Sequence, residues 1–444
     1  MASAAAATTS TDAPASAGGV AETCAAAKRA ARALAQCATS VKDDALGAIA
    51  RALRERTPEI LRANQLDIQV GERDGIGDAL LDRLRLDEAR IEGIARAVEE
   101  IAALPDPVGE VIEGRRLPNG LDLRKVRVPL GVVAVVYEAR PNVTVDAAAL
   151  ALKSGNAIVL RGSSAASHSN AVLAEIVSEA AVAAGLPAGC VGLVAGGGRE
   201  ELAELATQTG TVDLIIPRGG EGLKAALQSV ATVPVIYAAS GNCHIYVHAG
   251  ADLEQALAIV LNAKVQRPGV CNAAETLLVH ESLADEFVPL VLEGLGDAGV
   301  LVRADEDTIA RAGGDPRAGS QQLGGALVEP ASDEDFATEY LAPIIAVAIV
   351  SGLEEALEHI ARHGSGHSEA IVTRDAAAAA AFRFAVDAAC VYVNASTRFT
   401  DGGEFGMGAE IGNSTQKLHA RGPIGLRELC TFKYIVEGDG HVRS

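Results

Sequence analysis

The sequence predicts an α/β protein built on parallel β-sheets. Short apolar runs that suit strands, such as Gly131–Tyr137 and Ala157–Leu160, alternate with longer segments of helical periodicity. Such alternation is typical of βαβ units, in which a helix returns the chain to the start of the next parallel strand. The length of 444 residues and the hydrophobic share of 49% suffice for two or three lobes. Ligands of such sheets bind beyond the carboxyl ends of the strands.

The chain opens with a helical region at 21–103, where Asp43–Arg56 and Asp82–Ile101 repeat apolar residues at helical spacing. A second α/β set is expected at 276–393, interrupted by a Gly/Pro-rich stretch at 312–330 that we expect to be a surface excursion. A helix over Asp252–Val265 joins the two sets, and Thr431–Val436 is expected to be a late strand. The other strands expected in the first sheet are Cys190–Val194, Val212–Ile216 and Val233–Ile236, and its helices are Asp146–Leu152, His168–Ala184, Glu200–Ala206 and Gly222–Val230.

Composition excludes several classes of function. The net charge of −20, without a long basic block, argues against nucleic acid or an acidic membrane as a partner. No apolar run reaches the ~20 residues that a transmembrane helix needs. Residues 1–20 are mainly Ala, Ser, Thr and Pro and are expected to form a disordered tail. Seven scattered cysteines favour a reducing cytoplasm over a disulfide framework or a zinc site, and no metal is expected.

Cys271 differs from the other cysteines in its setting. It follows the loop Arg267–Gly269 and precedes the apolar strand Thr276–His280. A nearby cation and a loop favour the thiolate, which is the form that attacks a carbonyl. The alternative is an unreactive core thiol, which is the usual state of a buried cysteine. The six others lie beside runs of Ala, Val, Leu or Gly, and they are Cys24, Cys37, Cys190, Cys243, Cys390 and Cys430.

Three loops at strand ends carry polar residues that suit chemistry. After the first strand, Asn142 can donate a hydrogen bond to a developing oxyanion, although Pro-Asn is also ordinary turn chemistry. Arg161–Ser164 places a cation, a glycine and two hydroxyls ahead of a helix, which suits a phosphate. Arg218–Gly220 repeats this logic. Two such loops in successive units of one sheet predict a phosphate-rich cofactor.

Five strings stand in order along the chain: VPLGVVAVVYEARPNVTVD (128–146), DLIIPRGGEGL (213–223), QRPGVCNAAETLLV (266–279), YVNASTRFTDGGEFGMGAE (392–410) and STQKLHARGPIGL (414–426). Together they resemble the gamma-glutamyl phosphate reductase family of the aldehyde dehydrogenase superfamily. The resemblance covers about residues 21–436 and implies an aldehyde dehydrogenase-like fold of two doubly wound parallel-sheet lobes plus a β oligomerisation hairpin. It implies an NADPH-binding domain at 21–125 and 145–250, a catalytic domain at 251–393, and oligomerisation segments at 126–144 and 394–440 in a homo-oligomer.

The resemblance also implies roles for individual residues. Cys271 is the expected nucleophile, and Asn142 together with the backbone N–H of Cys271 is expected to form an oxyanion hole. Arginines are candidates for the substrate's phosphate and α-carboxylate, since Arg binds both bidentately, with a surface ion pair as the alternative for each. The cofactor-binding residues implied are Arg161, Gly162, Ser163, Arg218, Gly219, Gly220 and Glu339, and the substrate arginines are Arg140, Arg267, Arg398 and Arg421.

One departure from the superfamily pattern is informative. Hydrolytic members carry a water-activating Glu where this chain has Ala238, at the start of Ala238–Gly241. Without that carboxylate, phosphate is the expected acyl partner. The resemblance therefore implies NADPH-dependent reduction of L-glutamyl 5-phosphate to L-glutamate 5-semialdehyde and phosphate through a cysteine thioester, the second step of proline biosynthesis from glutamate. Glutamate 5-kinase is a candidate partner. The alternatives are an acylating aldehyde dehydrogenase on another small aldehyde and a non-catalytic scaffold on the same fold.

Overall fold

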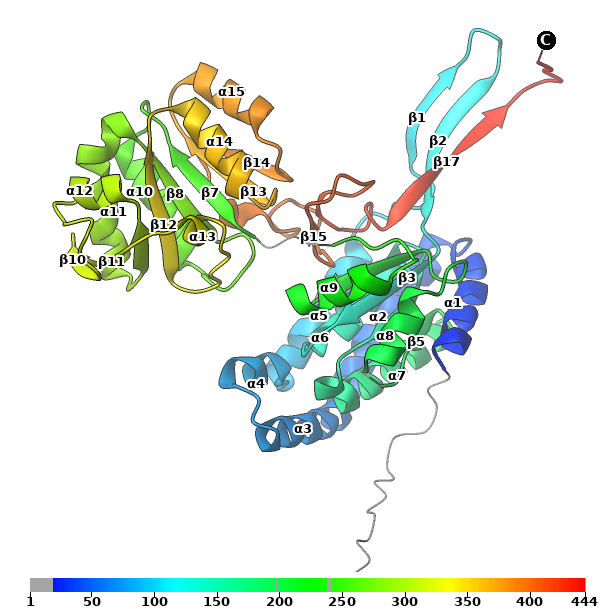
Figure 1. Ribbon diagram of the computed structural model, residues 1–444. Coiled ribbons are helices and arrows are strands. Elements are labelled where there is room, and N and C mark those ends of the chain that lie inside the picture. Colours follow the sequence, from blue (N-terminus) through cyan, green and yellow to red (C-terminus); the bar gives the residue numbers. More distant parts are fainter. Residues whose placement is uncertain (1–18, 197, 238–240, 444) are drawn as a thin grey trace, which may run out of the picture.

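The computed structural model describes residues 19–196, 198–237 and 241–443. The chain forms two α/β lobes, each around its own largely parallel sheet, and an antiparallel arm that projects outward (Figure 1). This architecture confirms the predicted α/β fold with two parallel-sheet lobes. No helix in the described part of the chain is both long and apolar enough to span a bilayer.

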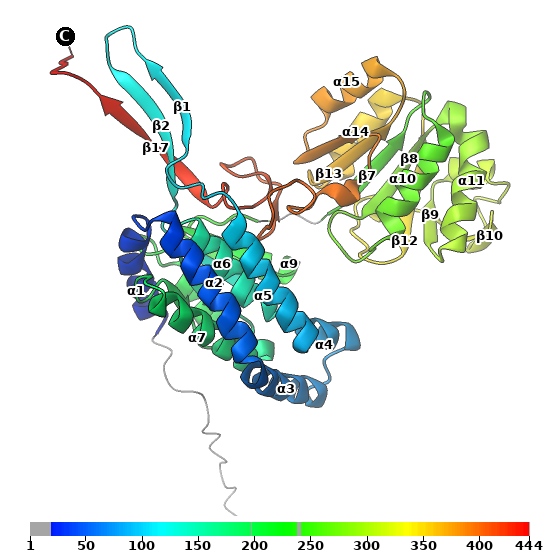
Figure 2. The same ribbon diagram turned by 180° about the vertical axis from the view of Figure 1, so that it is seen from behind.

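The N-terminal lobe is a four-stranded parallel sheet covered by helices on both faces. Its strand order is β5-β4-β3-β6. Alternate residues of β3 enter two different cores: Val133 and Val135 pack with helices α2, α5, α6 and α7, whereas Val132 and Ala134 pack with α1, α8 and α9 (Figure 2). Burial on both faces explains why β3 is an unbroken apolar run. The strands are β3 (Val132–Tyr137), β4 (Ala157–Arg161), β5 (Val191–Leu193) and β6 (Leu214–Arg218).

Two sequence predictions in this lobe were wrong. Asp82–Ile101 is not one helix: α4 ends at Leu84, and α5 begins after Asp87, whose carboxylate caps it by accepting from the Arg90 N–H. Val233–Ile236 forms only an isolated bridge to β6. The helices are α1 (Val20–Leu34), α2 (Thr39–Glu55), α3 (Thr57–Arg73), α4 (Asp78–Leu84), α5 (Glu88–Ala103), α6 (Asn142–Lys153), α7 (Ser167–Ala183), α8 (Arg199–Ala206) and α9 (Glu221–Val230).

The second lobe contains an eight-stranded sheet of order β10-β11-β9-β12-β8-β7-β13-β14. All neighbouring pairs are parallel except β10 and β11, which form a hairpin. The turn of this hairpin is Gly324-Gly325, with both φ angles positive, and β11 pairs with β9. The stretch at 312–330 is therefore partly a sheet edge, and the prediction of a surface excursion was wrong for β10 and β11. The strands are β7 (Cys243–Val247), β8 (Ala274–His280), β9 (Leu301–Ala304), β10 (Gln321–Leu323), β11 (Ala326–Pro330), β12 (Ile344–Val350), β13 (Ser368–Val372) and β14 (Cys390–Val393).

Helices of the second lobe return the chain between these parallel strands. Phe287, on α11, is fully buried in the core that β7, β8 and β12 share. Tyr246 and Phe382 are buried in a separate core on the other face of the sheet. The helices are α10 (Leu253–Val265), α11 (Ala284–Asp297), α12 (Glu306–Arg311), α13 (Asp333–Phe336), α14 (Leu353–His363) and α15 (Ala376–Ala385).

The arm is a three-stranded antiparallel sheet of β1 (Val111–Arg116), β2 (Asp122–Pro129) and β17 (Cys430–Glu437). Its boundaries differ from those that the resemblance implied, because β3 lies in the middle of the N-terminal lobe and β1 begins well before residue 126. Residues 394–429 contain the 3-10 helix η3 (Thr397–Phe399) and the short strands β15 (Asn413–Ser414) and β16 (Gly422–Pro423). This segment contacts both lobes and thereby connects them.

Candidate active site

Cys271 lies in a tight turn between α10 and β8. The Ala273 N–H donates to the Val270 carbonyl at 3.0 Å and closes the turn. The backbone of Cys271 is pressed against the start of β7, because the Cys243 thiol donates to the Cys271 carbonyl at 3.3 Å. A Cβ at position 241 would lie 1.7 Å from that carbonyl oxygen, so only glycine fits at Gly241. Two neighbouring strands thus fix the position of the nucleophile.

Burial dominates the electrostatics of the Cys271 thiol. Desolvation raises its pKa to about 11, while Arg218 lowers the pKa and Glu339 and Glu410 raise it further. The sequence suggested that the loop cation Arg267 favours the thiolate. The cation that lowers the pKa of this thiol is instead Arg218, which comes from the other lobe.

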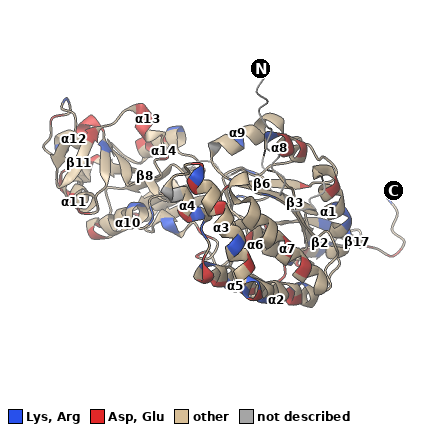
Figure 3. Ribbon diagram, turned by 90° about the horizontal axis from the view of Figure 1, so that it is seen from below, with Lys and Arg blue, Asp and Glu red and all other residues tan. Residues whose placement is uncertain are grey.

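An arginine cluster surrounds this thiol at the junction of the lobes. Desolvation lowers the pKa of Arg140, and the like charges of Arg218, Arg83 and Arg267 lower it further, while the Cys271 thiolate opposes them. Arg83 lies on α4 of the N-terminal lobe (Figure 3). In a chain of net charge −20, this local excess of cations favours an anionic ligand.

Arg398 and Asn272 form a brace beside the nucleophile. The Arg398 Nε donates to Gln266 Oε1 at 2.7 Å, and its guanidinium also hydrogen bonds to the Asn272 side chain. Asn272 in turn donates to the Thr400 carbonyl at 2.9 Å, and its own carbonyl accepts from the Thr397 hydroxyl at 2.7 Å. Asn272 therefore ties residues 397–400 to the turn of Cys271. Asn272 lies within the string at 266–279, but nothing in that string predicts this role.

Arg421 is placed differently from the other candidate arginines. Its guanidinium donates to Asp387 Oδ1 at 2.9 Å and to the Asp387 carbonyl at 3.0 Å. No contact in the described part of the chain brings Arg421 to Cys271. Arg421 forms an ion pair with Asp387, which is the alternative to substrate binding that the sequence left open for each arginine.

Asn142 is the first residue of α6. Its Nδ2 donates to Asp146 Oδ2 at 2.9 Å, which leaves a second amide hydrogen for another acceptor. Burial raises the pKa of Asp146 to about 6, while Asn142 and Arg218 lower it. Asp146 is a polar partner that the sequence analysis did not identify.

The end of β4 forms a second polar site in the N-terminal lobe. Arg161 is 6% exposed, and its Nη2 donates to the Gly198 carbonyl at 2.6 Å. Among the described residues, three buried polar atoms here have no partner: Arg161 Nε, Ser163 Oγ and Glu201 Oε2. A Cβ at Gly162 would lie 2.1 Å from the Asn170 amide nitrogen, so the loop needs glycine. Unpaired buried donors are expected where a polar ligand completes the site.

The end of β6 carries the other predicted phosphate loop. Arg218 is half-buried, and Gly412 packs against its guanidinium, since a Cβ there would lie 3.0 Å from Nη1. The Gly220 N–H donates to Glu138 Oε2 at 3.2 Å. A Cβ at Gly219 would lie 2.8 Å from the Glu138 carboxyl carbon. The two predicted phosphate loops lie at the ends of two strands of the same sheet, with β3 between β4 and β6.

A buried ion pair supports the loop that carries Glu339. Lys264 and Glu275, both fully buried, pair at 2.5 Å. Glu275 also accepts from the Leu341 N–H at 3.3 Å, and Glu339 accepts from the Gly241 N–H at 2.7 Å. Burial raises the pKa of Glu275 to about 7. Position 238, where a water-activating Glu was sought, lies outside the described residues, as do 239 and 240.

Known proteins match this fold and these residues over nearly their whole length. A profile of the aldehyde dehydrogenase family matches residues 4–310 and 323–435. The chain is 54% identical over 417 residues to the gamma-glutamyl phosphate reductase of Thermobifida fusca, covering 94% of this chain and 97% of that protein. It is 54% identical over 420 residues to that of Kineococcus radiotolerans, covering 95% of each. The crystal structure of gamma-glutamyl phosphate reductase from Thermotoga maritima superposes with a TM-score of 0.91 at 45% identity, covering 96% of this chain and 100% of that one.

The chain belongs to the aldehyde dehydrogenase family. Within that family, the relatives just described are gamma-glutamyl phosphate reductases, which confirms the resemblance carried by the five strings. The roles of the individual residues stay predictions.

Proposed function

We propose that the chain reduces L-glutamyl 5-phosphate to L-glutamate 5-semialdehyde, with NADPH as the reductant and Cys271 as the nucleophile. The observation that carries the proposal is a single half-buried thiol at the junction of two lobes, surrounded by arginines in an acidic chain. An acyl phosphate is a doubly charged anion with an electrophilic carbonyl. The arginines suit its charge, and the Cys271 thiol suits its carbonyl. The names and high identity of the relatives support the same reaction.

In the first step, the Cys271 sulfur attacks the acyl carbon, and the bond from that carbon to the phosphate oxygen breaks. Phosphate leaves with the electron pair and takes up the thiol proton as hydrogen phosphate, which balances the step. Arg218 opposes the effect of burial on the thiol and stabilises the negative charge that develops on sulfur. Asn142 and the Cys271 N–H are the donors for the tetrahedral oxyanion. Arg140 and Arg398 are the arginines best placed for the phosphate.

The unpartnered atoms at the end of β4 fit a nucleotide phosphate or ribose. Arg161 and Ser163 would hold it as donors, and Glu339, beside Cys271, would accept from a ribose hydroxyl. When bound, NADPH would supply a hydride for the acyl carbon. On the protein side, Asn142 would hold the substrate oxygen, and the C–S bond would break to release Cys271 as a thiolate, which takes up a proton from solvent. The preference for NADPH over NADH rests on Arg161 facing the 2′-phosphate.

The reverse reaction tests the proposal. With glutamate semialdehyde and NADP⁺, steady formation of NADPH is expected only when phosphate or arsenate is present to release the acyl group. Without either, about one NADPH per site is expected, followed by a stall, because the acyl-enzyme accumulates. Cys271→Ala is the control and should give no burst. Steady release of glutamate in phosphate-free buffer would overturn the proposal, and turnover driven by coenzyme A would favour the acylating alternative.

Three further features belong to the same proposal. A reduced nucleophile suits the cytoplasm, and all seven cysteines are unpaired in the structure. The projecting arm exposes Phe432, Tyr434 and Val436, which supports a homo-oligomer. Glutamate 5-kinase remains the candidate partner, because acyl phosphates are labile in water. Sedimentation of the chain alone tests the homo-oligomer. Sedimentation of the chain mixed with glutamate 5-kinase tests that partnership.

A further inference from the structure

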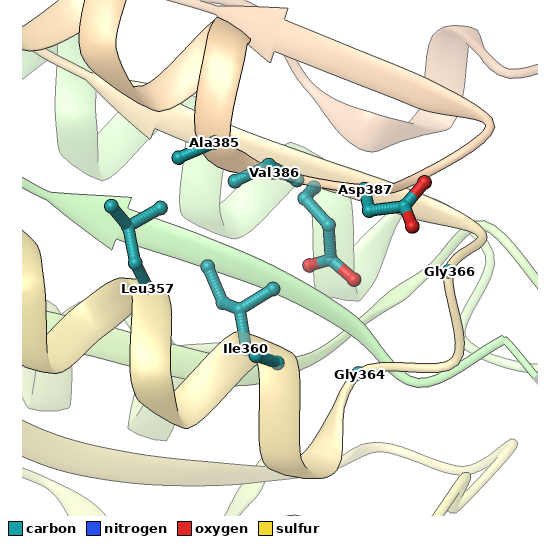
Figure 4. A pocket seen from close by; sticks show the side chains of 9 residues that line it. Leu357, Ile360, Gly364, Gly366, Ala385, Val386 and Asp387 are labelled. Carbon is teal, nitrogen blue, oxygen red and sulfur yellow. The ribbon is translucent and has the colours of Figure 1, made fainter.

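A cavity of about 240 Å³ lies in the second lobe between the ends of α14 and α15. Leu357 and Ile360 of α14 face Ala385 and Val386 across it (Figure 4). None of its lining residues belongs to the site around Cys271 or to the phosphate loops. The volume is several times the ~30 Å³ that one water occupies in the liquid, so the cavity accommodates a small molecule.

The cavity contains a buried carboxylate that is only half satisfied. Glu369, on β13, is 1% exposed. Its Oε2 accepts from the His244 backbone N–H at 2.8 Å and lies 3.0 Å from His244 Nδ1. Its Oε1 has no partner among the described residues. A Cβ built at Gly364, another lining residue, would lie 3.0 Å from Oε1, so this oxygen borders the space left open by that glycine.

A buried carboxylate oxygen without a donor is costly, and most such groups in proteins are hydrogen bonded. Burial raises the pKa of Glu369, and His244 opposes this rise only in part. The other acid at the cavity is neutralised: Asp387 pairs with Arg421 at 2.9 Å and also with Lys417. Glu369 is paired only at Oε2, with His244, and its Oε1 has no charged partner among the described residues.

We propose that this cavity binds a small alkylammonium ligand, whose nitrogen donates to Glu369 Oε1 and whose hydrocarbon part packs against Leu357, Ile360 and Val386. An ammonium group supplies both the donor and the positive charge that Oε1 lacks. Leu357, Ile360 and Val386 give the hydrocarbon part of the ligand an apolar surface, while Glu369 and Asp387 line the polar part of the cavity. Nothing in this proposal depends on the reaction at Cys271.

The test is a titration of the full-length protein with isobutylammonium chloride at pH 8, followed by ligand-observed NMR. Isobutanol has the same shape without the charge and is the matched neutral probe. For five heavy atoms in a largely enclosed site, a Kd of about 1 mM is expected. Isobutanol should bind at least about tenfold more weakly, since a charged donor pairs more strongly with a carboxylate than a neutral hydroxyl does.

Two variants locate the ligand. Glu369→Gln removes the charge with little change of shape, and Ala385→Leu fills the cavity from an exposed position while leaving Glu369 intact. Each should weaken isobutylammonium binding at least about tenfold. Glu358→Gln, the same chemical change on the exposed side of α14, should leave the affinity within about twofold of the wild type. If Glu369→Gln protein does not fold, weaker binding by Ala385→Leu protein still places the ligand in this cavity.

The proposal is overturned if the wild type shows no saturable binding of isobutylammonium, or if isobutanol binds equally well. Undiminished binding by folded Glu369→Gln protein would also overturn it. Undiminished binding by Ala385→Leu would place the ligand outside this cavity.

Discussion

The ends of β4 and β6 carry the same pair of residues, Arg followed by Gly, yet they form two different environments. Arg161 is buried under the loop that precedes α8 and is held by the Gly198 carbonyl. Arg218 is half-buried against Gly412, and its charge acts on the Cys271 thiol, Asp146 and Glu410. One arginine is surrounded by unpartnered polar atoms, and the other by acids and a thiol.

The difference arises from what covers each strand end. The segment at 394–429 passes over the end of β6 and brings Gly412 and Glu410 to Arg218. The end of β4 is covered instead by local residues, with Glu201 packed against Gly196 and Gly198. A short motif therefore fixes the position of a cation but not its partner. We expect Arg218 to serve the chemistry and Arg161 to serve cofactor binding.

The largest effect is expected at the thiol that Arg218 faces. Cys271→Ala and Cys271→Ser should each lower kcat by about 10⁴-fold or more, because a hydroxyl without a neighbouring base is a far weaker nucleophile than a thiolate. The measurement is steady-state reduction of glutamyl phosphate by NADPH. An active Cys271→Ala enzyme would show that the nucleophile is another residue.

Labelling gives an independent check on the same residue. Iodoacetamide is expected to modify Cys271 first among the seven thiols. Cys271 and Cys37 are partly exposed, and the other five cysteines are buried. Cys37 is therefore the expected competitor of Cys271 for the reagent. Labelling is followed by mass spectrometry of the peptides that contain each cysteine. Addition of glutamate semialdehyde should protect Cys271 and leave Cys37 unchanged, whereas faster labelling of a buried cysteine would contradict the assignment.

The comparison itself is tested by removing Arg218. Arg218→Ala should lower kcat by about 10²-fold, the range for loss of one charge-stabilising group. It should also slow alkylation of Cys271, because loss of the cation that lowers the thiol pKa reduces the thiolate fraction. The KM for NADPH should change little. A large rise in that KM with kcat unchanged would instead place Arg218 at the cofactor, where the sequence analysis had put it.

Removal of Arg161 should give the opposite pattern. Arg161→Ala is expected to raise the KM for NADPH about tenfold, with kcat and thiol alkylation nearly unchanged. NADH should be much less affected if Arg161 contacts the 2′-phosphate. An equal loss with both cofactors would move Arg161 to the shared pyrophosphate or ribose. Arg199→Ala, an exposed arginine at the start of α8, is the matched control, and a loss as large as that of Arg161→Ala would point to a nonspecific charge effect.

The sequence predicted the parallel strands well where burial on both faces dictates a continuous apolar run, as in β3 and β4. It failed where a strand is short and its pairing depends on distant residues. Residues 233–236 look like a strand but find only one bridge, and β10 and β11 were hidden in a stretch rich in glycine because their partner β9 lies elsewhere in the chain.

The same reason limits what the sequence could say about the site. Cys271, Arg161 and Arg218 stand in local strings and could be found. Asp146 and Glu410 owe their raised pKa values chiefly to burial, which a local string does not reveal. The Lys264–Glu275 pair also had no local signal, since either residue alone reads as a solvated charge.

The smallest expected effect concerns Glu410, the acid that Arg218 and Cys271 share. Burial raises the pKa of Glu410 to about 7, Asp401 adds to the rise and Arg218 opposes it. Ionised Glu410 raises the thiol pKa, so Glu410→Gln should lower that pKa and speed alkylation of Cys271. The sign depends on pH: below about pH 6 Glu410 is protonated and the variant should match the wild type, whereas above about pH 8 it should react about three to five times faster.

The measurement is the alkylation rate of the Cys271 peptide from pH 6 to 9, with Glu404→Gln as the control in the same loop. Glu404 is exposed and does not contribute to the shift at Cys271, so its variant should follow the wild type at every pH. A constant ratio across the pH range would show that Glu410 acts through packing and not through its charge. If the variant reacts more slowly than the wild type, Glu410 helps to deprotonate the Cys271 thiol. Glu410 would then be a general base beside Arg218.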